Sequence, residues 1–189
     1  MQSRSVVVSC TYMYRINELI LQKRPYYHTQ DLAVIWGITN KNTLYKTISR
    51  HLKRGILRPV HKGFYSTLPI GQLDPVALGI AFLHTFSYLS TESVLSAAGV
   101  INQNPEAITF VSSVSRNFEL GDNSYKVRKM KDQYLLNDRG LINKGNYMAA
   151  GTERAAADLL YFDPKYYFDN RNLADWNEVN KIQKEVYGL

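Results

Sequence analysis

Five polar or basic side chains between Lys41 and Arg54 have the types and the spacing needed to bind a polyanion. At about 100° per residue they fall within about a third of the circumference of an α-helix: Asn42, Thr43, Lys46, Arg50 and Lys53. Lysine and arginine bind phosphate oxygens, and asparagine, threonine and arginine also hydrogen-bond base edges in the major groove. The face has no acid. Because a solvated helix face, the alternative interpretation, usually mixes both signs of charge, we expect this one to contact DNA.

Two shorter helices are expected before this face. Apolar residues share one side of residues 12–22, and Pro25 is expected to stop that helix. Thr29 is expected to cap a second helix, with Asp31 in its first turn and a break at Gly37. The apolar face of the first helix consists of Ile16, Leu19 and Ile20. The second helix has a buried stripe of Leu32, Ile35 and Trp36, and Ile38 is expected to hold the turn after it to the core.

The third helix, which bears the basic face, is predicted from Asn40 to Arg54. Asn40 is a favourable capping residue, and Gly55 suits the left-handed conformation that ends many helices. Its apolar positions are spaced by four, with Tyr45 and His51 beside them: Leu44, Ile48 and Leu52. We interpret His51 as a core histidine rather than a ligand.

A β-hairpin is expected directly after the third helix. Residues 56–60 and 64–67 are β-prone runs around the turn His61-Lys62-Gly63. This order of elements predicts a winged helix-turn-helix: a short helix, a tight turn, a basic helix and a hairpin. We expect the third helix to enter the major groove and the wing to touch phosphate or the minor groove. The aromatic residues here are expected to pack rather than to stack on bases: Tyr26, Tyr27 and Phe64. The candidate DNA contacts are Lys41, Asn42, Thr43, Lys46, Arg50, Lys53, Arg58, His61 and Lys62.

The charge is unevenly distributed along the 189 residues. Residues 1–72 have eleven lysines and arginines against two acids, a net charge of +9, whereas residues 73–189 have a net charge of −2. Such a split between the halves of a chain suggests that one half binds a polyanion. We therefore expect a DNA-binding domain over residues 1–72 and a second domain over residues 73–189.

The sequence offers little for catalysis or for a cofactor. Cys10 is the single cysteine, so an intrachain disulfide and a cysteine-rich zinc site are excluded, and the four histidines lack metal-ligand spacing. The longest apolar run, residues 76–83, is too short for a membrane helix. We expect a cytoplasmic protein without a cofactor, a metal ion or an enzymatic activity.

The second half is predicted to be a small α+β domain. Helices are expected over residues 75–83, 91–98, 152–162 and 173–187, with Ser90 and Thr152 as caps of the second and third. Strands are expected over residues 108–113 and 125–131 and near residues 134–136 and 146–149, with a turn at residues 121–123. Glu153, Arg154 and Asp158 could form a polar site, but the simpler interpretation is an i,i+4 pair of Arg154 with Asp158, worth a few tenths of a kcal/mol.

Three segments, in this order, resemble the AbiEi-type antitoxins of bacterial toxin–antitoxin and abortive-infection loci. They are Arg54-Gly55-Ile56-Leu57 with Lys62-Gly63-Phe64-Tyr65, then Asp74-Pro75 with residues 87–95 (SYLSTESVL) and Gly99, then residues 152–160 (TERAAADLL). The resemblance spans most of residues 12–163. It implies an N-terminal domain that binds inverted repeats in its own promoter and represses transcription. It also implies a second domain that counteracts a nucleotidyltransferase-like toxin encoded nearby, with or without a stable complex.

Two other functions stay open from the sequence. The chain could be a winged-helix regulator with no toxin partner, its second half sensing a ligand or forming dimers. It could also be an enzyme that acts on nucleic acid, although it has no phosphate-binding glycine-rich loop, no cluster of carboxylates and no nucleophile–base pair. The identity of the neighbouring gene would separate the first two functions, and a nuclease assay with Mg²⁺ would test the third.

Overall fold

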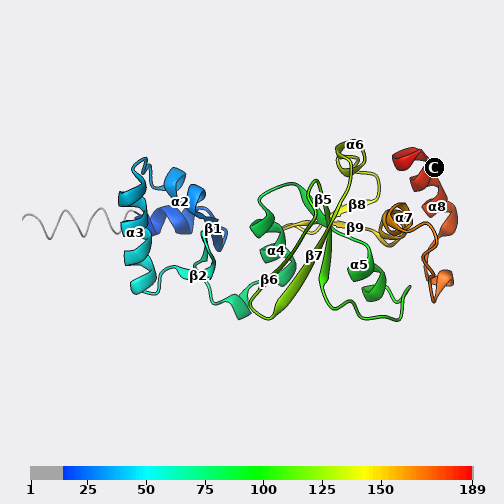
Figure 1. Cartoon of the computed structure of the whole chain (residues 1–189), viewed down its shortest axis with the longest axis horizontal. Coiled ribbons are helices and arrows are strands. Elements are labelled where there is room, and N and C mark those ends of the chain that lie inside the picture. Colours follow the sequence, from blue (N-terminus) through cyan, green and yellow to red (C-terminus); the bar gives the residue numbers. More distant parts are fainter. Residues whose placement is uncertain (1–14, 189) are drawn as a thin grey trace, which may run out of the picture. The chain divides into compact units, whose positions relative to one another are not determined.

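The computed structural model describes residues 15–188 and divides the chain into two compact units between Leu73 and Asp74. This division lies one residue after the expected domain boundary. The protein is a mixture of helices and strands, as the predicted α+β class requires (Figure 1). Each unit has a sheet of its own, with three strands in the first and six in the second.

The first unit packs three helices against a small antiparallel sheet. Its elements are a helix over residues 15–21, β1 (Tyr26–His28), α2 (Thr29–Ile35), α3 (Lys41–Lys53), β2 (Arg58–His61), β3 (Phe64–Ser66) and a 3₁₀ turn, η1 (Ile70–Gln72). The strand order is β1-β3-β2. The buried core is Leu19, Tyr27, Leu32, Trp36, Ile38, Leu44, Ile48 and Leu57. Tyr27 and Phe64 are buried, so their prediction as packing residues is confirmed.

In the first unit the predicted capping residue of α3 is confirmed, whereas the predicted end of the first helix and the predicted cap of α2 are not. The Asn40 side chain accepts a hydrogen bond from the Thr43 amide, as expected of a cap. The first helix ends at residue 21, so Pro25 does not stop it, and residues 12–14 of the predicted helix lie outside the described residues. Thr29 is not the cap of α2, because the cap position is His28, whose amide donates to the Asp31 carboxylate at 2.9 Å. Strand β1 was not predicted.

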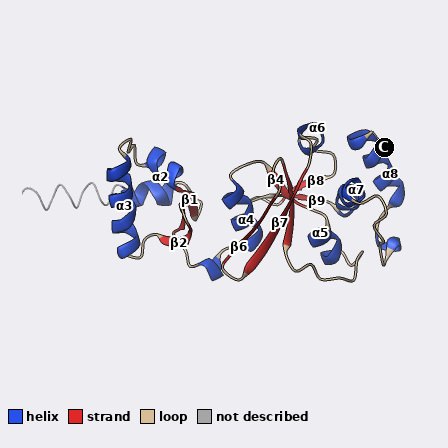
Figure 2. Ribbon diagram, viewed as in Figure 1, coloured by secondary structure: helices blue, strands red, loops and turns tan. Residues whose placement is uncertain are grey.

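The second unit is built on a mixed six-stranded sheet with helices on both faces (Figure 2). Its strands are β4 (Ser87–Leu89), β5 (Ile108–Ser112), β6 (Arg116–Leu120), β7 (Asn123–Lys129), β8 (Leu141–Asn143) and β9 (Met148–Ala150), in the order β6-β7-β5-β4-β9-β8. Its helices are α4 (Pro75–Leu83), α5 (Glu92–Ala97), α6 (Asp132–Leu135), α7 (Thr152–Phe162) and α8 (Trp176–Ile182), with a 3₁₀ turn, η2 (Arg171–Leu173), and a π-helical turn, η3 (Gln183–Tyr187).

Helices α4 and α5 lie on opposite faces of this sheet. Gly79 of α4 lies against the Phe110 ring, whereas Ser93 of α5 exchanges hydrogen bonds with Thr109. Because successive residues of a strand point to opposite faces, Phe110 and Thr109 place the two helices on different sides. The main core lies on the α5 face, where Tyr88 and Val111 of the sheet belong to one buried cluster with α7 and α8.

Several expectations for the second unit are corrected. Helix α4 has the predicted bounds, and the Asp74 carboxylate caps it. Ser90 and Thr152 are not caps, because the cap positions of α5 and α7 are Thr91 and Gly151. The run near residues 134–136 belongs to α6 rather than to a strand, and the last helix begins at Trp176 rather than at Leu173. Strands β4, β6 and β8 were not predicted.

Candidate nucleic-acid interface

The exposed side of α3 carries the predicted basic face. The buried side chains of α3 are Leu44, Thr47, Ile48 and His51, which fixes the side of the helix that faces the core. The outward stripe follows the spacing i, i+3, i+4, i+7 and i+11: Asn42, Tyr45, Lys46, Ser49 and Lys53. All nine candidate DNA contacts are exposed. The structure thus brings six of them together on α3 and the other three on the hairpin.

Two residues of the outward stripe were missed by the sequence interpretation. Tyr45 was expected to flank the apolar positions, but this residue is 55% exposed. Ser49 is exposed between Lys46 and Lys53. The helical spacing that selected Asn42 and Lys46 would also have selected Ser49, whereas an aromatic residue in an amphipathic helix is by default assigned to the core.

The inner side of α3 is held by hydrogen bonds that fix the rotation of the helix. The Thr47 hydroxyl donates to the Thr43 carbonyl at 2.8 Å and accepts from Nη1 of Arg15 at 3.2 Å. The His51 ring stacks on Trp36 with the ring centroids 4.9 Å apart, and its Nδ1 lies 2.8 Å from the Thr47 carbonyl oxygen. Burial lowers the pKa of His51, and the nearby Arg15 and Arg54 lower it further against the opposing effect of the Thr47 hydrogen bond. His51 is therefore a core residue, as predicted.

The β2–β3 hairpin follows α3 and presents three further candidate contacts, Arg58, His61 and Lys62. Gly63 has a φ of +77°, which suits the tight turn between the strands. The amide and the hydroxyl of Thr29 both donate to the Gly63 carbonyl, at 2.9 and 3.2 Å. These bonds tie the tip of the hairpin to the start of α2, so that the hairpin is braced against the body of the unit.

No negative charge lies in the chain between Leu32 and Leu73. In the first unit, one of the two acids is Asp31, which pairs with Arg24 at 3.5 Å, and the other is Glu18. The potential over α3 and the hairpin is consequently set by lysines and arginines with no acid of the same segment to offset them.

The polar residues singled out in the second unit form a buried network instead of an open site. Arg154 and Asp158 form the expected i,i+4 pair, with Nε and Oδ1 2.7 Å apart. Both side chains are fully buried, so the expected energy of a few tenths of a kcal/mol, which applies to an exposed helix face, is wrong. The Asp158 carboxylate also accepts from the Ser90 hydroxyl at 2.6 Å and from the Tyr187 hydroxyl. Each of the five N–H groups of Arg154 has a partner: Asp158, Tyr88 and the carbonyls of Tyr134, Asn137 and Arg139.

Neither a metal site nor a membrane segment is found within residues 15–188. No three histidine, cysteine or acidic side chains in that part of the chain are grouped closely enough to hold a metal ion. None of its helices has the length and apolar character needed to cross a bilayer.

Comparisons with known proteins identify a fold but no family. No protein-family model matches the chain, and no curated protein matches it. Among solved structures the chain is similar to the crystal structure of the RV2827C protein from Mycobacterium tuberculosis, with a TM-score of 0.55 and 12% sequence identity over 93% of this chain and 71% of that chain. At this level of identity, the similarity supports the fold alone.

Proposed function

We propose that the chain binds double-stranded DNA through its first unit, which acts as a winged helix-turn-helix. Helix α3 would be the recognition helix, preceded by α2 and a tight turn at Gly37, and the β2–β3 hairpin would be the wing. One observation carries this proposal: the outward face of α3 and the tip of the hairpin are exposed, basic and free of acids. A helix with neutral polar and basic groups on its outer face supplies both base-edge donors and phosphate contacts.

The wider role that we propose is that of an antitoxin and autorepressor. The resemblance of three segments to AbiEi-type antitoxins supports this role, in which the first unit represses the promoter of the locus at inverted repeats. The second unit would counteract a nucleotidyltransferase-like toxin in the cytoplasm, through its surface and without catalysis. The net charge of −2 over residues 73–189 supports separate roles for the two units, because a negatively charged second unit is not attracted to DNA as the first unit is.

The DNA interface is tested by comparing a selected operator with an unrelated duplex. We expect Lys46→Ala or Arg50→Ala to cost about 1–3 kcal/mol on the operator alone, because a base contact is lost. We expect Lys62→Ala to weaken both duplexes about equally and to reduce the slope of log affinity against log salt by about one. Lys165→Ala, on an exposed residue of the second unit, is the matched control and should change neither affinity.

Fluorescence anisotropy over a range of salt concentrations measures these affinities. A fragment ending at Leu73 should retain most of the non-specific affinity of the full chain. If residues 74–189 bind duplex DNA more tightly than residues 1–73, or if Lys62→Ala alone changes sequence preference, the assigned roles are wrong.

The antitoxin role needs an assay that excludes repression. The neighbouring toxin is expressed from an unrelated promoter, and growth is measured with and without the full chain. We expect rescue by the intact chain and by a variant in which Lys46 and Arg50 are both replaced by alanine, because neither residue belongs to the second unit. Absence of rescue by the intact chain would leave a plain transcriptional regulator, whose DNA binding is tested independently.

A further inference from the structure

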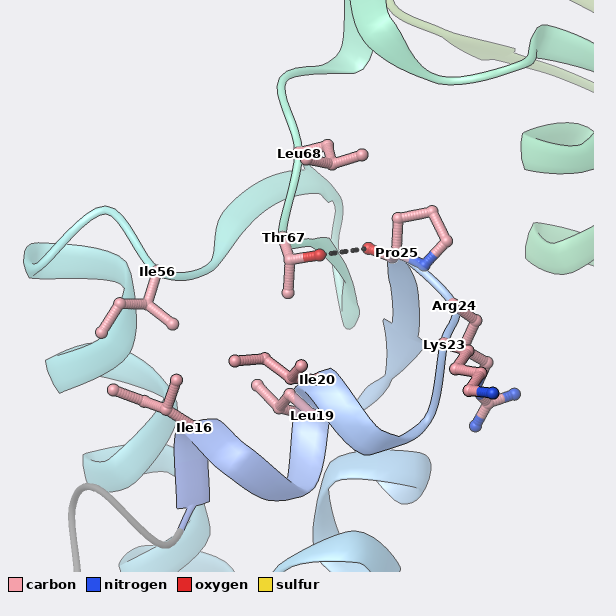
Figure 3. A pocket seen from close by; sticks show the side chains of 9 residues that line it. All are labelled: Ile16, Leu19, Ile20, Lys23, Arg24, Pro25, Ile56, Thr67 and Leu68. Atoms are coloured by element: carbon pink, nitrogen blue, oxygen red, sulfur yellow. Dashed lines mark hydrogen bonds between the residues drawn. The ribbon is translucent and has the colours of Figure 1, made fainter.

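The first unit has an open apolar groove that shares no residue with the proposed DNA contacts. It has a volume of about 470 Å³. Figure 3 shows that it lies between the helix of residues 15–21 and the segments that carry Ile56 and Leu68. The lining residues are Ile16, Leu19, Ile20, Lys23, Arg24, Pro25, Ile56, Thr67 and Leu68. Because α3's outward face contributes none of them, a ligand in the groove and a DNA duplex on α3 would use different side chains.

Two aliphatic side chains that line the groove are exposed. Ile20 is 68% exposed and Leu68 is 42% exposed, while the neighbouring Leu21 is 69% exposed. Leu19 is 3% exposed and therefore belongs to the core at the base of the groove. The Thr67 amide donates to the Pro25 carbonyl at 2.8 Å, which joins the two walls at one end. An exposed apolar surface bordered by polar residues is typical of a protein-binding site.

Two basic residues lie at one end of the groove, on the side away from Ile16 and Ile56 (Figure 3). Lys23 and Arg24 follow the first helix and line the groove, and the Arg24 guanidinium is paired with Asp31 at 3.5 Å. Within the described residues, Lys23 has no acidic partner within ion-pair distance. Lys23 and the net charge of +9 over residues 1–72 favour an acidic occupant, although Glu18 lies on the same helix as Ile16 and Ile20.

We propose that this groove binds an amphipathic helix of a partner protein. Its apolar face would cover Ile16, Ile20 and Leu68, and its acidic side chains would lie beside Lys23 and Arg24. The chemistry of the groove disfavours two other occupants. A nucleic acid has no aliphatic surface to cover the two isoleucines, and a second copy of the chain would bring together two units that each have a net charge of +9 over residues 1–72.

The probe for this proposal is a synthetic helical peptide of about 16 residues, with leucines along one face and glutamates elsewhere. It is titrated into the ¹⁵N-labelled full chain. We expect amide shifts near Ile20, Lys23, Ile56 and Leu68, a micromolar dissociation constant and weaker binding at high salt. Two control peptides, one with lysine in place of every glutamate and one with glutamine in place of every leucine, should bind at least about tenfold more weakly.

Two substitutions separate the groove from exposed apolar surface in general. Ile20→Gln should weaken the peptide about tenfold, because it removes a side chain that the apolar face would cover. Val34→Gln is the matched control, since Val34 is 81% exposed on α2 but does not line the groove. The proposal is overturned if both substitutions have the same effect, if the lysine peptide binds as tightly as the glutamate peptide, or if no peptide shifts the groove amides. It is also overturned if sedimentation shows a dimer that Ile20→Gln dissociates, because the occupant is then a second copy.

Discussion

Replacing Asp158 by asparagine should be among the most damaging single changes in the second unit. The carboxylate receives three donors, from Arg154, Ser90 and Tyr187. Burial alone would lower the pKa of Arg154, but the adjacent Asp158 carboxylate, together with Tyr88 and Tyr187, raises the pKa above its ordinary value. Arginine therefore stays charged, and Asp158→Asn leaves that charge in the core without its counterion.

The size of the effect follows from the burial of the pair. Removing one partner of a buried ion pair costs about 3–5 kcal/mol, because the remaining charge is desolvated and uncompensated. An exposed pair contributes about 0–1 kcal/mol. Since Arg154 and Asp158 both have 0% exposed side chains, the larger value applies. The exposed pair of Arg139 with Glu178 is a control in the same unit, and Glu178→Gln should cost less than about 1 kcal/mol.

Urea unfolding measures both changes in the free energy of unfolding. The chain has two tryptophans, Trp36 in the first unit and Trp176 in the second, so a Trp36→Phe background makes the fluorescence report on the second unit. The midpoint should fall with little change in the slope against urea concentration. A cost for Asp158→Asn no greater than that for Glu178→Gln would refute the reasoning from burial.

Three further outcomes are expected. Burial lowers the pKa of His51 from its ordinary value of 6.5, so the unfolded chain binds a proton on His51 more readily than the folded chain does. The contribution of His51 to the stability of the first unit should therefore be complete above about pH 6.5 and be lost as the pH falls below it. His51→Gln should flatten this pH dependence, as measured by urea titrations. Gly79→Ala would place a Cβ 2.5 Å from the Tyr125 ring and should cost about 1–3 kcal/mol in thermal unfolding, whereas Gly71→Ala, with no atom within 4 Å, should cost almost nothing. Tyr45→Ala should weaken operator binding about tenfold and Tyr45→Phe less, if its exposed ring contacts DNA; unchanged anisotropy for both variants would remove it from the interface.

Elements with complete local signals could be predicted from the sequence. Asp74 and Pro75 begin α4 as a cap and a first-turn proline, and the predicted and observed bounds agree. For α3 the bounds agree to within one residue, because the Asn40 cap and Gly55, with a φ of +70°, lie just outside the helix. The exposed set of candidate contacts on α3 follows directly from those bounds, because the helical period then decides which side chains face outward.

Very short strands could not be predicted, because their stability comes from partners far along the chain. The three residues of β1 pair with Ser66, Tyr65 and Phe64, and β4 pairs with both β5 and β9. Neither strand has room for the alternating pattern that identifies a strand by itself. Ser90 was assigned to a cap for a related reason: its hydroxyl partner, Asp158, lies 68 residues away and gives no local signal.

The Arg154–Asp158 pair shows where a periodic pattern is ambiguous and which neighbouring residues resolve it. A spacing of four places two side chains on one side of a helix but does not say whether that side faces water or the core. Between them lie Ala155, Ala156 and Ala157, which are all 0% exposed. Three successive alanines span about 200° of a helix, so more than half of its circumference has only methyl side chains and can pack closely against neighbouring elements. A charged pair that flanks such a run is therefore expected to be buried together with it, and its energy is then set by its partners rather than by its spacing.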